Sequence, residues 1–209
     1  MPGTSMTLHH PDGQIFLFDA GALCLELLLT GGPGPVAARF EVLDRPGGGG
    51  LLDWVRDSAR LAPGLADVLP RTVTDAELGA VRETRDALWR LALARAGGGP
   101  LGPADLALLN AAAARPPLAT RLTADGRREW APGATVGGLV ATIARDAVEL
   151  FSGPYADRVR VCGAADCQLL FADTSRPGRR RWCAMERCGN RQKVRAHRAA
   201  RTPAEGGTR

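Results

Sequence analysis

Apolar positions in the first part of the chain recur mostly at helical spacing. The clearest case runs from Asp75 to Ala96 and is predicted to be a helix with one buried face. Thr74 and Glu77 form a capping box, in which each side chain satisfies a backbone donor at the helix start. The apolar stripe of this helix consists of Leu78, Val81, Ala87, Leu88, Leu91 and Ala92.

The same reasoning places the other elements, and the Gly and Pro residues between them end each segment. We expect a strand at Gln14 to Phe18, a second at Ala38 to Leu43, and a hairpin from Leu118 to Trp130 around Asp125-Gly126. The predicted helices cover Asp19 to Leu29, a short segment from Leu51 to the stop at Pro63-Gly64, Pro103 to Ala114, and Thr135 to Phe151.

These elements predict a mainly α protein with small β elements, an α+β fold. We expect a mostly helical domain at residues 1–157, a zinc module at 158–202 and a disordered tail at 203–209. The helical part has no Gly-rich phosphate loop, nucleophile elbow or His–carboxylate set, so we expect no enzyme. His9 and His10 lie near the start, where a frayed terminus is expected. The chain has no long apolar run and no signal peptide, which predicts a cytoplasmic protein without a membrane partner.

Cysteine spacing carries the strongest chemical signal. Four of the five cysteines lie within 27 residues, as two C-x-x-x-x-C pairs separated by 15 residues. Four soft ligands on tight turns predict one structural Zn(II) ion, with no coordination position left for a substrate. An iron–sulfur cluster and two disulfides are the alternatives. The predicted ligands are Cys162, Cys167, Cys183 and Cys188, whereas Cys24 is expected to be a buried apolar side chain.

The segment between the two pairs has the length of a hairpin. We predict that its strands are Leu169 to Asp173 and Arg180 to Trp182, and that it returns the second pair to the first. A helix is expected to begin near Cys188 and to end at about Arg201. A knuckle, a hairpin and a helix together predict a treble-clef or ribbon-like zinc fold. Metal binding would supply folding free energy of the order of 10 kcal/mol to so small a module.

Charge is divided unevenly along the chain. Residues 1–157 contain 14 Arg and 18 acidic residues, a net of −4, whereas residues 158–209 contain 13 basic and 4 acidic residues, a net of +9. This asymmetry predicts an anionic partner for the C-terminal module, and Arg side chains suit phosphate and guanine. The predicted nucleic-acid contacts are Arg176, Arg179, Arg180 and Arg181 at the hairpin tip, and Arg187, Arg191, Lys193, Arg195 and Arg198 on the helix.

Several partners fit this basic module. We favour duplex DNA, since a helix on a zinc platform suits a major groove and the module has few aromatic side chains for stacking single strands. The alternatives are RNA, an acidic protein, or a solvated helix that forms ion pairs with the acidic part of the chain. A homodimer would increase specificity, and the helical domain would serve for dimerisation or for sensing a small-molecule effector.

The cysteine module resembles a known family. The run Trp182-Cys-Ala-Met-Glu-Arg-Cys188-Gly-Asn-Arg191, the first cysteine pair and Asp173-Thr174-Ser175 are similar to the CGNR zinc finger. In that family the finger follows a helical domain called ABATE, which is associated with stress-induced transcription regulation. A looser similarity covers Leu23 to Leu28, Leu51 to Val55, Arg85 with Leu88, and the helix ending at Phe151. The resemblance implies zinc binding, nucleic-acid binding and regulation. The excess of Ala, Gly, Pro and Arg is typical of a GC-rich bacterial genome.

Overall fold

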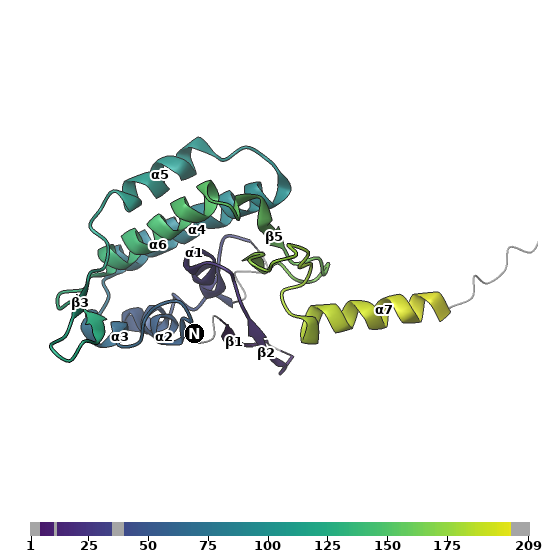
Figure 1. Ribbon diagram of the computed structural model, residues 1–209, viewed down its shortest axis with the longest axis horizontal. Helices are drawn as coiled ribbons and strands as arrows, with labels where there is room; N and C mark the ends of the chain where they lie inside the picture. The colour runs from purple at the N-terminus through teal and green to yellow at the C-terminus, as the bar shows by residue number, and fades with distance from the viewer. Residues whose placement is uncertain (1–4, 11, 35–39, 202–209) are drawn as a thin grey trace, which may run out of the picture.

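The computed structural model describes residues 5–10, 12–34 and 40–201, with side chains described up to Arg195. Three helices form the upper layer, and shorter elements lie beneath and beside them (Figure 1). The α-helices are α1 (Leu23–Leu27), α2 (Gly49–Asp57), α3 (Leu65–Val68), α4 (Asp75–Gly97), α5 (Pro103–Ala113), α6 (Val136–Ser152) and α7 (Asn190–Arg201). Single turns of other helix types are η1 (Leu28–Thr30), η3 (Pro46–Gly48), η4 (Ala156–Arg158) and η5 (Met185–Gly189).

Three small antiparallel sheets of two strands each complete the described part. They pair β1 (Met6–His9) with β2 (Ile15–Phe18), β3 (Thr120–Leu122) with β4 (Arg128–Trp130), and β5 (Val159–Val161) with β6 (Leu170–Ala172). The predicted α+β class is therefore confirmed. No helix in the described residues combines the length and apolar character that crossing a membrane requires.

The central helices begin where their capping residues place them. Thr74 Oγ1 accepts a hydrogen bond from Glu77 N, and Glu77 Oε2 accepts one from Thr74 N at 2.9 Å, so the predicted capping box is confirmed. Thr135 Oγ1 accepts from Gly138 N at 3.0 Å and starts α6. Helices α4, α5 and α6 pack on one another, and α1 packs against α6.

The helix predicted from Asp19 begins four residues late, at Leu23. Gly21 has a φ of +82°, and a Cβ at this position would lie 2.3 Å from the carbonyl oxygen of Ala172. The neighbouring carbonyl of Ala20 accepts a hydrogen bond from Ala172 N at 2.9 Å. The chain before α1 is thus held out of the helix by its contact with β6 of the cysteine module.

Other predicted boundaries also moved. The short helix ends at Asp57 rather than near Pro63, because Ser58 turns inward and donates to Glu26 Oε2 at 2.6 Å. The strand predicted at residues 38–43 is wrong in its described part, 40–43, which is not extended sheet. His9 lies in β1, so the expected frayed start is wrong there, whereas the tail expected at 203–209 lies outside the described residues.

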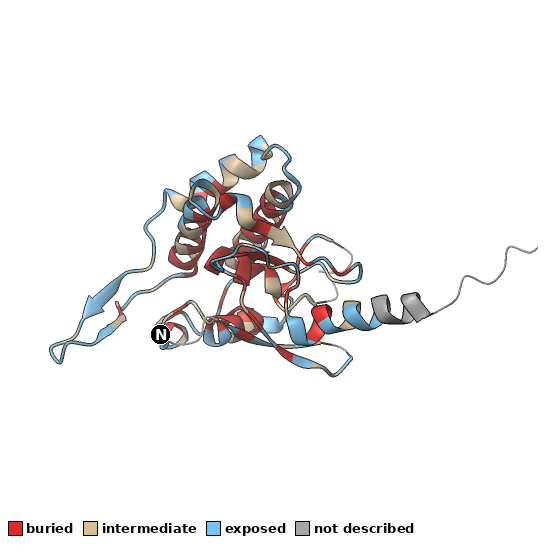
Figure 2. Cartoon of the chain, turned by 45° about the vertical axis from the view of Figure 1, so that its right-hand side comes forward, coloured by how far each residue is buried: buried red, intermediate tan, exposed pale blue. Residues whose placement is uncertain are grey.

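One contiguous apolar core includes residues from both ends of the chain. It joins Phe16 and Phe18 of β2 and Leu88 of α4 to Val159 and Phe171 of the cysteine module, all of them nearly inaccessible to solvent. Figure 2 shows the buried residues concentrated at this junction, whereas α7 extends into solvent. The cysteine module is therefore packed into the rest of the protein and is not a free appendage.

Candidate metal centre

The first cysteine pair lies in the turn that joins β5 to β6. Cys162 N donates to Leu169 O at 2.9 Å, which continues the β5–β6 ladder into the turn. Cys167 N donates to Ala164 O at 3.0 Å and tightens the loop between the two ligands. Both sulfur atoms are consequently directed to one side of a short knuckle.

The strand partner predicted for this hairpin is wrong. We expected residues 180–182 to pair with 169–173, but β6 pairs with β5, and residues 180–182 are not in a strand. A loop anchored by the buried side chain of Asp173 instead brings the second cysteine pair back to the first. Its Oδ2 accepts from Arg180 N at 2.7 Å, and its Oδ1 accepts from Ser175 N at 3.1 Å. Burial opposes ionisation, but these hydrogen bonds outweigh it and lower the pKa of Asp173.

The loop sets the second cysteine pair against the knuckle. Gly163 N donates to Arg181 O at 2.9 Å, and Cys183 N donates to Cys162 Sγ at 3.3 Å. A Cβ on Gly163 would lie 3.1 Å from the Trp182 ring, so a larger residue would push the two turns apart. Cys188 follows within η5, which leads directly into α7. The helix predicted to begin at the second pair is confirmed.

The four predicted ligands converge. The sulfur atoms of Cys162, Cys167, Cys183 and Cys188 all lie within 4.8 Å of one another. Cys183 Sγ lies 3.8 Å from Cys167 Sγ and 3.4 Å from Cys188 Sγ. Four thiolates about 2.3 Å from one tetrahedral Zn(II) would be about 3.8 Å apart, so the donor set fits a single structural zinc ion. The cysteines are free, and these separations exceed the ~2.05 Å of a disulfide bond.

Thiol electrostatics also favour a cation at this point. Hydrogen bonds from Cys167 and Cys183 lower the pKa of Cys162 to about 2. The hydrogen bond to Cys162 and burial raise the pKa of Cys167 to about 12. Hydrogen bonds with Cys162 and Cys167, with burial, raise the pKa of Cys183 well above its usual range. The negative charge of one thiolate disfavours ionisation of the neighbouring thiols. Four thiolates at this point therefore require a divalent cation among them.

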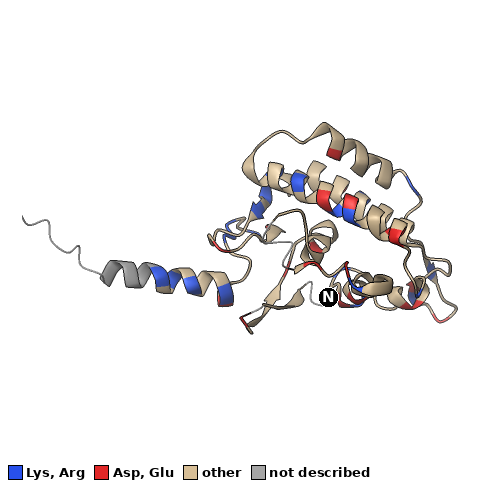
Figure 3. Cartoon of the chain, turned by 180° about the vertical axis from the view of Figure 1, so that it is seen from behind, with Lys and Arg blue, Asp and Glu red and all other residues tan. Residues whose placement is uncertain are grey.

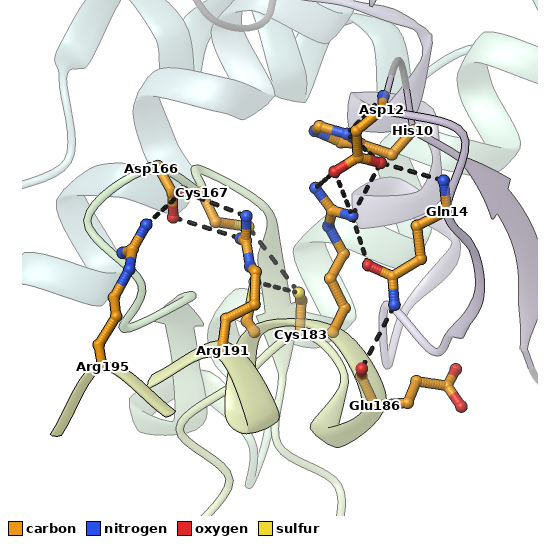
Figure 4. A network of polar contacts seen from close by, with 11 residues as sticks. His10, Asp12, Gln14, Asp166, Cys167, Cys183, Glu186, Arg191 and Arg195 are labelled. Carbon is orange, nitrogen blue, oxygen red and sulfur yellow. Dashed lines mark hydrogen bonds and ion pairs between the residues drawn. The ribbon is translucent and has the colours of Figure 1, made fainter. Parts of the chain in front are cut away.

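Arg191 extends the metal centre outward. Its NH2 group lies 3.3 Å from Cys188 Sγ, and its guanidinium also pairs with both carboxylate oxygens of Asp166 at 3.2 and 3.3 Å (Figure 4). The hydrogen bond to Cys188 raises the pKa of Arg191. Arg195 NH2 lies 3.3 Å from the same Asp166. The knuckle and α7 are thus connected by an ion-pair network that the sequence did not reveal.

The predicted nucleic-acid residues fall into distinct environments. Arg187 is buried, Arg180 and Arg191 are half-buried, and the side chain of Arg198 lies outside the described residues. The exposed members are Arg176, Arg179, Arg181, Lys193 and Arg195. Among the described residues, none of Arg176, Arg179 and Arg181 has an ion-pair partner, although Arg181 lies over the Trp182 ring at 5.1 Å.

Arg180 is used inside the protein. Its guanidinium donates to the carbonyl oxygens of Asp19 at 2.7 Å, Trp182 at 3.0 Å and Cys183 at 2.5 Å. It also lies 4.1 Å above the Phe171 ring, and burial lowers its pKa. Arg180 therefore connects the cysteine loop to the chain before α1. The only sequence signal for this role is its place beside a predicted ligand turn.

Arg187 is the second internal arginine. Its side chain is 3% exposed, lies 5.3 Å from the Phe16 ring centroid, and contacts Asp12 at 3.2 Å and Gln14 at 2.7 Å. A backbone hydrogen bond from Gln14, assisted by His10 and Arg187, lowers the pKa of Asp12 to about 2. Arg187 was predicted, with residues 191, 195 and 198, to contact nucleic acid from the helix. Its side chain instead lies inside the protein.

Two family models match consecutive parts of the chain. ABATE, described as "Putative stress-induced transcription regulator", matches residues 21–154, which is more than half of the sequence. The CGNR zinc finger matches residues 158–201 and contains all four clustered cysteines. Comparison with curated proteins gave no match. Strands β1 and β2 lie outside both matched ranges.

Proposed function

Because the chain belongs to the ABATE family and ends in a CGNR zinc finger, we propose that it is a transcription regulator that binds duplex DNA through its basic C-terminal module. In this proposal zinc stabilises the fold of the module, and the exposed Arg and Lys side chains of the module contact phosphates. The helical domain senses an effector or pairs two copies. In this proposal the protein binds and regulates, and it catalyses no reaction.

One observation carries the proposal. Helix α7 starts at the metal cluster and projects away from the body (Figure 1), and it contains no acidic residue. Figure 3 shows Lys and Arg along its described part. A free basic helix on a rigid base has the dimensions of the helices that enter a major groove. Gln192 and Asn190, which is exposed at the first turn, carry side-chain amides of the kind that suit adenine edges.

The loop before the second cysteine pair supplies a second group of cations. Arg176, Arg179 and Arg181 are exposed and have no ion pair among the described residues, so their guanidinium groups are available to phosphate oxygens. Loop contacts of this kind fix register on a duplex, and the helix then meets base edges. The proposed contact set is therefore Arg176, Arg179, Arg181, Lys193 and, with Asp166 displaced, Arg191 and Arg195.

Titration of zinc-loaded protein into fluorescent duplex DNA and single-stranded RNA, at several salt concentrations, tests this proposal. The logarithm of duplex affinity should fall with the logarithm of salt concentration by about 0.9 per neutralised phosphate. Joint replacement of Arg176, Arg179 and Arg181 by Ala should reduce that slope. Matched replacement of three exposed arginines at the β3–β4 hairpin, Arg121, Arg127 and Arg128, should leave it unchanged.

Binding to RNA with no duplex binding would replace DNA by RNA in the proposal. A second candidate is a docking surface for an acidic protein. It is favoured by Met185 and Val194, which are 52% and 49% exposed on η5 and α7 and would give a partner an apolar contact among the cations. Failure to bind either nucleic acid at low salt would favour this second candidate.

A further inference from the structure

The hairpin of β1 and β2 precedes the ABATE match and is distant from the finger in sequence. Its side chains alternate, with Phe16 and Phe18 buried and Ile15 and Leu17 each 59% exposed. The two buried rings lie beneath the guanidinium groups of Arg187 and Arg180, at 5.3 and 5.6 Å. The inner face of the hairpin is thus covered by two arginines of the finger.

The edge of β2 is also held by the finger. Leu17 N donates to the carboxylate of Glu186 at 2.8 Å. Gln14 Nε2 donates to the Glu186 carbonyl oxygen at 3.3 Å, as Figure 4 shows. A two-stranded sheet is only marginally stable alone, and an unpaired strand edge leaves donors unsatisfied. Glu186 therefore supplies the acceptor that a third strand would provide.

Arg187 completes this attachment from the next position in the chain. It is 3% exposed and contacts Asp12 and Gln14 at the hairpin turn, while Cys188 follows it as a metal ligand. Residues 186 and 187 thus fix the turn between the last two ligands, and α7 begins three residues later. Helix α7 continues directly from this same turn, η5.

We infer that the β1–β2 hairpin is a third structural part of the zinc finger, beside the cysteine turns and α7. In this inference Asp12, Gln14 and Arg187 are positioning residues that orient α7 for nucleic acid. The inference rests on the proposed function for its nucleic-acid part. The coupling of hairpin to metal centre stands on the contacts alone. In this arrangement the metal and the hairpin each hold one side of η5, and loss of either releases the base of α7.

Hydrogen exchange of the full zinc-loaded chain tests the coupling without any nucleic acid. Removal of zinc by a chelator should remove protection of the amides of residues 15–18, although no ligand lies within 140 positions of them. Protection that persists in β2 after complete metal loss would overturn the inference, whether or not the protein binds DNA. Protection of α5 serves as an internal reference and should change little.

Replacement of Asp12 tests the positioning role, because positioning and plain electrostatics predict opposite changes in duplex affinity. Asp12→Ala removes a negative charge, which alone would tighten binding to DNA. Loss of orientation predicts instead roughly three- to tenfold weaker duplex binding with an unchanged zinc content. Asp53→Ala, which removes an exposed acid paired with two arginines of the body, is the matched control and should not weaken binding. Duplex affinity that is equal or higher in Asp12→Ala would overturn the positioning role, and absence of wild-type binding would overturn the proposed function separately.

Discussion

Asp166 in the first cysteine turn and Arg191 at the start of α7 form a two-point ion pair, with both carboxylate oxygens 3.2 to 3.3 Å from guanidinium nitrogens. The acid belongs to the knuckle and the base belongs to the helix, so the pair connects the two halves of the metal centre. It also places one negative charge among the cations proposed to contact phosphate.

Asp166 should therefore reduce nucleic-acid affinity. In Asp166→Asn the side chains of Arg191 and Arg195 lose this ion pair, and duplex affinity should rise roughly twofold to fivefold at low salt, the scale of an exposed ion pair. The difference should shrink as salt rises, because exposed charges are screened. Fluorescence anisotropy measures both, and Asp53→Asn, another acid shared by two arginines, is the control. Weaker binding of Asp166→Asn with full zinc content would contradict the expectation.

Metal content should follow the clustered cysteines alone. The purified chain is expected to hold one zinc ion, and Cys188→Ser should lose it together with the folding free energy that the metal supplies, of the order of 10 kcal/mol. Cys24 is completely buried in α1 and is not one of the clustered cysteines, so Cys24→Ala should keep full occupancy. Zinc measured by mass spectrometry after dialysis decides the matter. Equal zinc in wild type and Cys188→Ser would exclude this ligand.

Arg180 should be a stability residue rather than a binding residue. Arg180→Ala leaves three carbonyl oxygens without this donor, at about 1 to 3 kcal/mol for each group that becomes unsatisfied. We expect a loss of about 3 kcal/mol or more in the free energy of unfolding. The exposed neighbour is the matched comparison, since Arg179→Ala should change stability by less than about 0.5 kcal/mol and weaken duplex binding instead. Urea unfolding with saturating zinc separates the two, and equal midpoints would refute the assignment.

Glu26 should make stability depend on pH. Burial raises its pKa to about 7, against the opposing effects of Ser58 and Arg60, and its Oε1 accepts no hydrogen bond. A carboxyl whose pKa rises on folding contributes most below its unfolded pKa of about 4.3, and that contribution is lost as the pH rises through about 7.

The matched variant for this group is Glu26→Gln, which resembles the protonated form. Between about pH 5 and pH 8 the wild type should lose about 2 to 3 kcal/mol of unfolding free energy relative to this variant. Urea titrations at several pH values measure the difference between the two proteins, in which the contributions of other groups cancel. Parallel curves across this range would show that Glu26 has an ordinary pKa.

The sequence by itself determined the metal ligands and the principal helices. The cysteine spacing identified all four ligands, since two pairs on tight turns bring four sulfurs together whatever surrounds them. Thr74 with Glu77 and the apolar stripe of α4 located that helix, because capping and periodicity are local properties. The family resemblance on Cys183 to Arg191 agrees with the CGNR match, and the looser similarity in the helical part agrees with the ABATE match.

Only the tertiary structure decided which arginines are exposed and available to contact a partner. Arg187 and Arg181 have the same chemistry and each lies within two residues of a metal ligand, yet Arg187 is buried and Arg181 is exposed. The partner of Arg187 is Asp12, 175 positions away, and the partner strand of β6 was likewise misassigned. The local sequence pattern indicates which interactions a side chain is able to make. Burial of a charged side chain depends on which distant segment packs against it, and only the folded chain specifies that contact.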